Sequence, residues 1–326
     1  MNTACADWRP LGRRELARAT TLVRRHVPPT PQREWPLLSQ RLGAEVWVKH
    51  ENHAPTGAFK VRGGLVLLDR LSRERPRVPG VISATRGNHG QSLAFAARLH
   101  RLRAVICVPH GNSLEKNAAM RALGAELIEH GRDFDEARAH AGRLATEQGL
   151  RFVNSFTREL VLGVATYALE FLQGAPPLDI VYVPVGMGSS LCAMIAVRDL
   201  LRLDTEIVGV QAAGAPSYCE SFRRRGVVTT AQAVTLADGL ATRVPDPQAV
   251  KLMLRGASRM VRVDDAAIGE AVGIYFSDTH NLAEGAGAAP LAAALRERKR
   301  LAGRRVGLVL SGGNIDLPLF RSWVTG

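Results

Sequence analysis

The chain has 326 residues, of which 46% are hydrophobic and 22% are charged, a composition typical of a soluble globular protein with one large or two smaller domains. Its formal net charge of +13 is compatible with nucleic-acid binding, but the arginines are scattered among acidic residues, without an aromatic-rich RNA motif or zinc-finger spacing. No apolar run reaches the ~18 residues of a membrane span, and the N-terminus lacks the apolar core of a secretory signal. We therefore expect neither a nucleic-acid partner nor a membrane partner.

The first predicted element is an amphipathic helix near the N-terminus. Leu16, Ala19 and Val23 follow the i, i+3, i+7 spacing of one helix face. The segment is Arg-rich, as transit peptides are, but the spacing favours a helix of the folded protein.

Short apolar or β-branched runs then alternate with Ala/Leu/Arg-rich segments of helical length. The predicted strands are 44–50, 80–85, 103–109, 125–130, 179–186, 206–211 and 305–313. The predicted helices between them include 88–101, 113–123, 134–148, 159–173 and 265–277. Fully apolar strands separated by helices indicate mostly parallel sheets covered on both faces, hence an α/β architecture.

Three turns rich in Gly, Ser or Asn directly follow predicted strands. They are "SATRGNHGQS" (83–92), "VPVGMGSSLC" (183–192) and "LSGGNID" (310–316), and the first two lead into predicted helices. Ligand sites of such sheets gather where strands end, so these turns are the candidate binding loops.

One lysine has unusual surroundings. The chain has five lysines, Lys49, Lys60, Lys116, Lys251 and Lys299. An arginine cannot be deprotonated in a protein, so an amine nucleophile must come from these five. Lys60 lies in "NHAPTGAFKVRGG" (52–64), among small and apolar residues that would lower its pKa by burial. Taken alone, a lysine near a helix start is more often a surface residue.

The segment "PVGMGSS" (184–190) has the features of a phosphate-binding turn. Its glycines allow close backbone approach, and its free N–H groups would lie at a helix N-terminus whose dipole favours negative charge. A tight turn without a ligand explains this motif equally well. It fits neither the dinucleotide G-x-G-x-x-G pattern, because Leu191 occupies the last position, nor the P-loop pattern. Together with an isolated lysine, it indicates pyridoxal phosphate (PLP), whose aldehyde reacts with a lysine amine.

These motifs carry a family resemblance. "LGAEVWVKHENHAPTGAFKVRGG" (42–64) resembles the lysine segment of fold type II PLP-dependent enzymes, the tryptophan synthase β-like family, in its serine/threonine dehydratase and serine racemase branch. "TRGNHGQS", "PVGMGSS" and "LSGGN" follow in that family's order and approximate spacing, so the resemblance covers about residues 28–316.

The resemblance implies a role for each motif. Lys60 would bind PLP as a Schiff base and, once substrate displaces it, remove the α-proton. Asn88 would hydrogen-bond to the cofactor's 3-hydroxyl group, and Ser311 would face its pyridine nitrogen. The phosphate would be bound by Gly186, Met187, Gly188, Ser189 and Ser190. The substrate carboxylate would be bound by backbone N–H groups of the loop formed by Thr85, Arg86, Gly87, Asn88 and His89.

The serine opposite the ring nitrogen has a chemical consequence. Its hydroxyl satisfies the nitrogen without forcing protonation, so the ring withdraws electrons less strongly than it would beside an aspartate. A carbanion that is stabilised less expels a β-substituent promptly. Hydrolysis of the eliminated product would then give a 2-oxo acid and ammonia.

Two features, one in the loop before the first predicted binding helix and one at a metal site, depart from the racemase pattern. Arg86 stands where serine racemases have a serine that acts as a second acid/base, and an arginine, with a pKa of about 13, serves poorly there. Its side chain would either help to bind a carboxylate or point to solvent. Gln211 and Ser217 stand where racemase-like members have two acidic metal ligands, so we expect no divalent metal site there. His50 and His53 form HxxH without further ligands and are expected to be ordinary loop residues.

The resulting hypothesis is a PLP-dependent lyase with two domains. It would convert a β-hydroxy α-amino acid, L-threonine, L-serine or a bulkier relative such as a 3-aryl-serine or hydroxyaspartate, into a 2-oxo acid and ammonia. The alternatives are a racemase, a cysteine synthase-like β-replacement enzyme and, from a different class, a non-catalytic basic binding protein. The family implies two open twisted, mostly parallel sheets with flanking helices, in a large PLP-binding domain (1–74 plus 154–326) and a small inserted domain (75–153), and a homodimer.

Four cysteines bear on the compartment. Cys5, Cys107, Cys192 and Cys219 lie far apart and form no CxxC pair. Such spacing is typical of reduced thiols, so we expect a cytoplasmic location.

Overall fold

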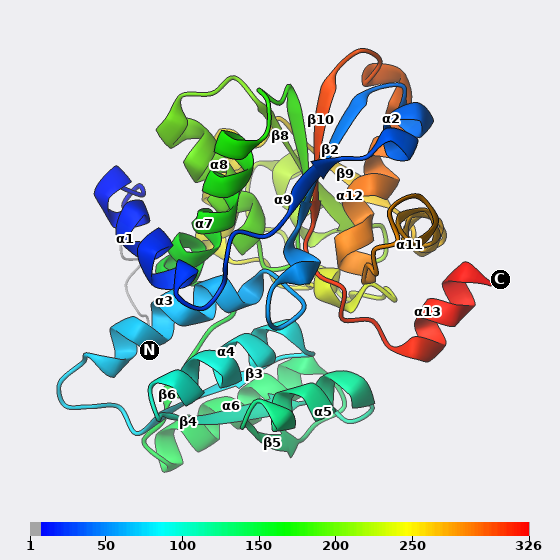
Figure 1. Ribbon diagram of the computed structural model, residues 1–326. Helices are drawn as coiled ribbons and strands as arrows, with labels where there is room; N and C mark the ends of the chain where they lie inside the picture. The colour runs from blue at the N-terminus through cyan, green and yellow to red at the C-terminus, as the bar shows by residue number, and fades with distance from the viewer. Residues whose placement is uncertain (1–7, 326) are drawn as a thin grey trace.

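The computed structural model describes residues 8–325 and contains two β-sheets, each flanked by helices (Figure 1). The larger sheet has six strands in the order β1-β2-β10-β7-β8-β9. All neighbours pair in parallel except β1, which runs antiparallel to β2 at one edge. The strands are β1 (Gln32–Glu34), β2 (Glu45–His50), β7 (Ile180–Pro184), β8 (Glu206–Ala212), β9 (Arg259–Val263) and β10 (Arg305–Leu310).

The smaller sheet is fully parallel and comes from one continuous part of the chain. Its four strands have the order β5-β4-β3-β6. They are β3 (Gly80–Ala84), β4 (Arg103–Val108), β5 (Glu126–Glu129) and β6 (Arg151–Phe152). Both sheets are therefore of the mostly parallel, doubly covered kind that the sequence predicts.

The helices divide between the faces of the two sheets. The six-stranded sheet is associated with α1 (Arg13–Arg24), α2 (Pro36–Leu42), α3 (Lys60–Ser72), α7 (Arg158–Gly174), α8 (Ser189–Leu201), α9 (Ser217–Arg224), α10 (Pro247–Gly256), α11 (Asp265–Thr279), α12 (Gly285–Arg296) and α13 (Leu317–Val324). The four-stranded sheet is covered by α4 (Asn88–Leu99), α5 (Leu114–Ala122) and α6 (Phe134–Glu147). Short 3-10 helices are η1 (Glu51–His53), η2 (Asp238–Leu240) and η3 (Arg298–Arg300).

Three apolar clusters fill the spaces between these layers. One packs α11 and α12 against the six-stranded sheet, and another packs α6 against the four-stranded sheet. The largest cluster is continuous from α7 and α8 through α3 to α4 and β4. Helix α3 thus lies between the two halves of the molecule, as Figure 1 shows. Because apolar burial is the main stabilising term, this shared core holds the halves together.

Every strand predicted from the sequence is present, with ends that differ by a few residues. Three further strands, β1, β6 and β9, were not predicted, and all three lie at sheet edges. An edge strand has a neighbour on one side only, so it is short or tolerates exposed charge, and β9 carries Arg259 and Arg262. The predicted N-terminal helix is α1, with Leu16, Ala19 and Val23 buried.

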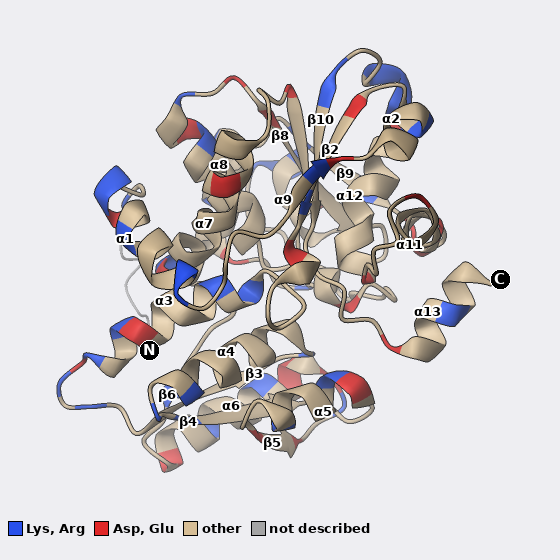
Figure 2. Cartoon of the chain, viewed as in Figure 1, with Lys and Arg blue, Asp and Glu red and all other residues tan. Residues whose placement is uncertain are grey.

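The surface agrees with the composition. In Figure 2, basic and acidic residues are interspersed over the visible face rather than gathered in one basic tract. Among residues 8–325, no helix is both long and apolar enough to cross a bilayer. Cys107, Cys192 and Cys219 are buried free thiols, and Cys5 lies outside the described residues.

Candidate active site

Lys60 is the first residue of α3 and lines a cavity of about 590 Å³ between the two sheets. Its Nζ donates a hydrogen bond to Ser189 Oγ at 3.1 Å and lies 4.9 Å from the centre of the Phe59 ring. Ala58 and Phe59 are buried next to it, and Phe59 also lines the cavity. Burial lowers the pKa of Lys60 to about 8, so a neutral amine is accessible near physiological pH.

Two glycines fix the helix that carries this lysine. A Cβ on Gly63 would lie 2.9 Å from the Leu160 carbonyl oxygen in α7, and one on Gly64 would lie 2.2 Å from Ser92 Oγ in α4. A side chain at either position would therefore push α3 away from its neighbour. Gly63 and Gly64 therefore allow close packing of α3 against both helices.

The first and last motifs of the sequence are bonded to each other. The Phe59 amide donates to the Ser311 carbonyl at 3.0 Å, and the Gly313 amide donates to the Gly57 carbonyl at 2.9 Å. Ser311 follows β10, is buried, and lines the same cavity as Lys60. These backbone bonds hold the Ser311 turn and the Lys60 turn at fixed positions in the wall of the cavity.

The second glycine-rich turn opens helix α8 into the cavity. Gly188 is its N-cap, with a φ of +90° that a glycine adopts without strain. Ser189 and Ser190 follow, and Ser190 Oγ is hydrogen-bonded to the buried Tyr167 hydroxyl at 2.6 Å. Burial raises the pKa of Tyr167 well above its usual value, so this hydroxyl stays protonated and anchors the turn.

Helices α4 and α8 begin without a side-chain cap, as do α1, α2, α3, α9, α12 and α13. By contrast, side chains accept backbone N–H groups at the starts of α5, α6, α7, α10 and α11, where the caps are Ser113, Asp133, Thr157, Asp246 and Asp264. The free N–H groups of α4 and α8 open into one cavity, and such helix N-termini bind anions.

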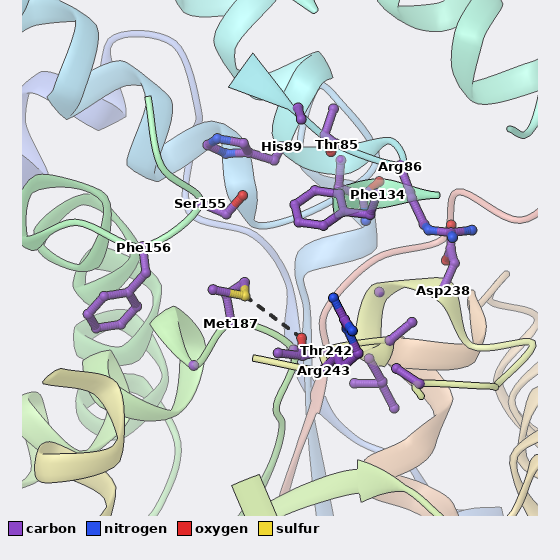
Figure 3. Close-up of a pocket in the computed structure, with 18 of the residues that line it drawn as sticks. Thr85, Arg86, His89, Phe134, Ser155, Phe156, Met187, Asp238, Thr242 and Arg243 are labelled. Atoms are coloured by element: carbon purple, nitrogen blue, oxygen red, sulfur yellow. Dashed lines mark hydrogen bonds between the residues drawn. The ribbon is translucent and has the colours of Figure 1, made fainter. Parts of the chain in front are cut away.

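The loop before α4 forms the opposite wall of the cavity (Figure 3). The Gly87 amide donates to Thr85 Oγ1 at 3.0 Å, which shapes the turn. His89 is buried, and burial lowers its pKa to about 3, so its imidazole is neutral. Arg86 is exposed yet also lines the cavity, so the structure combines the two positions considered for it.

Asn88 joins the loop before α4 to Glu284 and to the turn after Ser311. Its Nδ2 donates to Glu284 Oε1 at 2.7 Å, and its Oδ1 accepts from Asn314 Nδ2 at 2.8 Å. Asn314 Nδ2 also donates to the Thr56 carbonyl at 2.8 Å. The side-chain amide of Asn88 is therefore oriented by the turn that follows Ser311.

A charged group beside Asn88 was not predicted from the sequence. Lys116 Nζ lies 2.5 Å from Asp238 Oδ2 and 3.8 Å from Glu284 Oε2, and that second oxygen of Glu284 has no hydrogen-bond partner among the described residues. Burial raises the pKa of Glu284 to about 7, although Lys116 opposes this shift. The three residues come from α5, η2 and the N-cap of α12, so no local sequence pattern predicts that they lie together.

All the predicted site residues line this one cavity. They are Lys60, Thr85, Arg86, Gly87, Asn88, His89, Gly186, Met187, Gly188, Ser189, Ser190 and Ser311. Residues from α6 and from the loop after η2 complete the lining and were not predicted, among them Phe134, Asp135, Arg138 and Arg243. Nothing in their local sequence distinguishes them from ordinary helix-start and loop residues.

The side chains at the two altered metal positions are engaged within the protein. Gln211 Oε1 accepts the Cys219 amide at 2.9 Å, and Ser217 Oγ donates to the Thr242 carbonyl at 2.7 Å. The expectation that His50 and His53 are loop residues was wrong: His50 ends β2 and His53 lies in η1. His50 Nε2 accepts from Trp35 Nε1 at 2.9 Å, and no group of three potential metal ligands occurs within residues 8–325.

The fold and the cavity define a class of protein. A buried amine of lowered pKa beside two uncapped helix N-termini, between two parallel sheets, suits an enzyme that binds a phosphorylated aldehyde covalently and an acidic substrate next to it.

Known proteins narrow this class. A model described as "Pyridoxal-phosphate dependent enzyme" matches residues 23–312. An L-threonine ammonia-lyase of Thermotoga maritima is 35% identical over 284 residues, which are 87% of this chain and 70% of that protein. An L-threo-3-hydroxyaspartate ammonia-lyase of Saccharomyces cerevisiae is 30% identical over 310 residues, 94% of each. The processed form of threonine deaminase isoform 2 from Solanum lycopersicum has a TM-score of 0.87 at 26% identity, covering 97% of this chain and 94% of that one.

The chain therefore belongs to the pyridoxal-phosphate dependent enzyme family, and its cofactor is PLP. The fold class and the family resemblance predicted from the sequence are both confirmed.

Proposed function

We propose that the protein is a lyase that converts a β-hydroxy α-amino acid, such as L-threonine or L-serine, into a 2-oxo acid and ammonia. The observation that carries this proposal is the position of Lys60, whose amine lies in a cavity with the free N–H groups of α4 and α8. The names of the relatives in Thermotoga maritima and Saccharomyces cerevisiae, both ammonia-lyases, support the same reaction type.

The donor set of the cavity fits PLP. The turn at Gly188, Ser189 and Ser190 supplies backbone N–H groups and hydroxyls for the phosphate, and Ser189 Oγ lies 3.1 Å from the Lys60 amine. Asn88 would hydrogen-bond to the 3-hydroxyl group, and Ser311 would face the ring nitrogen. When bound, PLP withdraws electrons from the substrate α-carbon.

The remaining steps belong to the side chains. Lys60, with a pKa of about 8, would take the α-proton as its amine and return a proton to the departing hydroxyl. The α4 N-terminus would orient the substrate carboxylate. Water lost in the elimination is regained in the hydrolysis, so the net products are a 2-oxo acid and ammonia.

A racemase would need a second acid/base on the face opposite Lys60. Arg86 occupies the corresponding position of the loop, and a guanidinium exchanges protons poorly. We therefore assign elimination rather than racemisation as the principal activity.

Three further proposals concern organisation. We place the small inserted domain at 75–153 and the large domain at 1–74 plus 154–326, supported by the strands β3 to β6, which form a sheet of their own. We also propose a homodimer and a cytoplasmic location. Light scattering of the purified protein measures the oligomeric state, and fractionation of the source cells measures the location.

The proposed function has a direct test. Purified protein should be yellow, borohydride should fix the cofactor to a peptide containing Lys60, and L-threonine or L-serine should release a 2-oxo acid. Following both enantiomers of serine in the same assay separates elimination from racemisation, and O-acetylserine with sulfide tests β-replacement. A colourless protein that does not bind PLP, or a bound cofactor with no 2-oxo acid from any β-hydroxy amino acid, would refute the proposal.

A further inference from the structure

Arg86 stands out among the cationic residues of the cavity. Its side chain lines the cavity and makes no hydrogen bond or ion pair with any residue in the described part of the chain. Only its backbone carbonyl is engaged, by Asn112 Nδ2 at 3.3 Å. A guanidinium offers five donors in a planar fork that matches a carboxylate, so an unpartnered one in a binding cavity is a ready anion site.

The other cations of the cavity already have partners. Lys116 forms an ion pair with Asp238 and Arg243 forms one with Asp135, whereas Arg138 makes one long hydrogen bond, 3.5 Å, to the neutral amide oxygen of Asn154. Lys60 is the proposed site of covalent attachment. Among the described residues, Arg86 is the cation of the cavity whose side chain makes no hydrogen bond or ion pair.

The acids of the cavity do not compensate Arg86 either. Asp133 and Asp246 accept backbone N–H groups as helix caps, and Asp135 and Asp238 belong to the pairs above. Glu284 faces Asn88 and Lys116. An anionic ligand group near Arg86 thus adds a pair to the cavity and breaks none.

Arg86 lies next to the proposed binding site of the substrate α-carboxylate. It directly precedes Gly87, the N-cap of α4, whose free N–H groups suit the substrate α-carboxylate. Figure 3 shows Arg86 at the side of the cavity on which Asp238 lies, away from Phe156 and Ser155. Its long side chain extends beyond the turn itself, so it suits a second acidic group rather than the first.

We infer that Arg86 determines specificity for β-hydroxy amino acids with an acidic group on the β-carbon, of which 3-hydroxyaspartate is the simplest. This inference rests on the proposed function and names its substrate class. The atoms of the reaction balance with such a substrate. The β-hydroxyl leaves as water, hydrolysis consumes one water, and the products are a dicarboxylic 2-oxo acid and ammonia.

Apolar walls in the same cavity bear on the aryl alternative. Phe134 and Phe156 offer surface to a 3-aryl-serine. An aryl group, however, would leave the guanidinium with a weaker cation–π contact in place of two charge-assisted hydrogen bonds. The unpartnered Arg86 therefore favours the acidic substrate.

The test compares two substrates in holoenzyme variants. We expect Arg86→Ala to lower the ratio of kcat/KM for L-threo-3-hydroxyaspartate to kcat/KM for L-threonine by about 10- to 100-fold, the loss typical of one hydrogen-bonded charge pair. Arg86→Lys, which keeps the charge but not the fork, should recover part of the ratio. Arg70→Ala, which removes an exposed arginine of α3 outside the cavity, should leave it within about twofold. An equal loss on both substrates would assign Arg86 to the α-carboxylate and overturn the inference, as would an unchanged ratio.

A binding measurement makes the inference independent of turnover. Succinate has the carbon skeleton and both carboxylates of hydroxyaspartate, whereas butyrate has one carboxylate fewer. In calorimetric titrations of the holoenzyme, Arg86→Ala should weaken succinate at least about tenfold more than butyrate. Equal weakening of both ligands would contradict the inference. If the wild type binds succinate through Arg86 but converts no β-hydroxy amino acid, the proposed function fails and the anion site stands.

Discussion

Two charged clusters, one centred on Arg62 of helix α3 and one in the cavity, are built on different principles. The first, which we call the Arg62 cluster, contains Lys49, Glu51, Arg62 and Glu170. Arg62 donates to both oxygens of Glu51 and of Glu170 at 2.8–3.0 Å, and Lys49 donates to Glu170 at 2.7 Å. The side chains of Lys49, Glu51 and Arg62 are 0% exposed, and two positive charges face two negative ones.

The second cluster, formed by Lys116, Asp238 and Glu284, lies in the cavity and is not balanced. One lysine faces two acids, and Glu284 Oε2 has no hydrogen-bond partner among the described residues. The pKa values of Glu170 and Glu284 reflect this difference in charge balance between the two clusters. Burial would raise the pKa of Glu170, but Arg62 and Lys49 outweigh it and hold the pKa below its usual value, whereas burial prevails at Glu284 and raises its pKa to about 7.

The contrast distinguishes a cluster that stabilises the fold from a cluster suited to a chemical role. A closed, neutral, fully bonded cluster fixes the packing of α3 against α7 and β2. A cluster with a spare acceptor and a shifted pKa keeps capacity for a proton or a ligand, as functional sites do. Lys60 and Arg62 are two residues apart on one helix, yet they belong to opposite sides of this division.

The largest effect should come from Lys60. Lys60→Ala removes the amine that binds the cofactor and takes the proton, so kcat should fall by about 10⁴-fold. The cofactor-free variant should unfold at no lower urea concentration than the cofactor-free wild type, because burial of the amine, which lowers its pKa, is unfavourable in itself. A variant that loses stability along with activity would show that Lys60 has a structural role as well.

Substitution of Arg62 should lower stability, in contrast to substitution of Lys60. Arg62→Met leaves Glu51 and Glu170 without their main partner, so the free energy of unfolding should fall by about 3–5 kcal/mol in urea titrations. Arg70→Ala is the matched control, because Arg70 lies on the same helix in exposed ion pairs with Glu74 and Glu159, worth less than about 1 kcal/mol. Similar losses in the two variants would contradict the distinction between a buried cluster and surface pairs.

The smallest effect, and the one that separates the clusters by sign, concerns Glu284 and Glu170. Folding raises the pKa of Glu284 from 4.5 to about 7, so the protonated carboxyl contributes stability to the folded state. This contribution is fully present below pH 4.5 and is lost as pH rises through about 7. Glu284→Gln should therefore stabilise the cofactor-free protein at pH 8 by about 1–3 kcal/mol and leave it nearly unchanged near pH 4.5.

Glu170→Gln is the matched control for this pH dependence. Folding lowers the pKa of Glu170, so its ionised form contributes stability above its unfolded pKa, and the substitution should destabilise the protein at pH 8. Urea titrations at the two pH values measure both variants. A change of the same sign in the two would show that the clusters do not differ as described.

The sequence predicted those parts of the molecule that depend on local patterns. The parallel strands follow from apolar runs, and the three binding turns follow from glycine, serine and asparagine directly after strands, because backbone geometry restricts those positions to few residue types. Lys60 could be identified because its immediate neighbours are small and apolar.

The charged clusters could not be predicted in the same way. Lys116, Asp238 and Glu284 come from distant segments, and each in isolation is an ordinary charged residue of a helix or loop. Lys49 and Arg62 likewise look like surface residues until α7 places Glu170 against them. The edge strands β1, β6 and β9 were missed for a related reason, since a strand with one neighbour needs no continuous apolar pattern.

The glycine contacts of α3 limit how the enzyme can be redesigned. Gly63 touches α7, from the half of the molecule with six strands, and Gly64 touches α4, from the half with four strands. The reactive amine therefore keeps its place relative to both walls of the cavity at once. Loops at the rim are open to replacement by an engineer seeking new substrates, whereas even a single methyl group on the back of this helix would displace the amine at its tip.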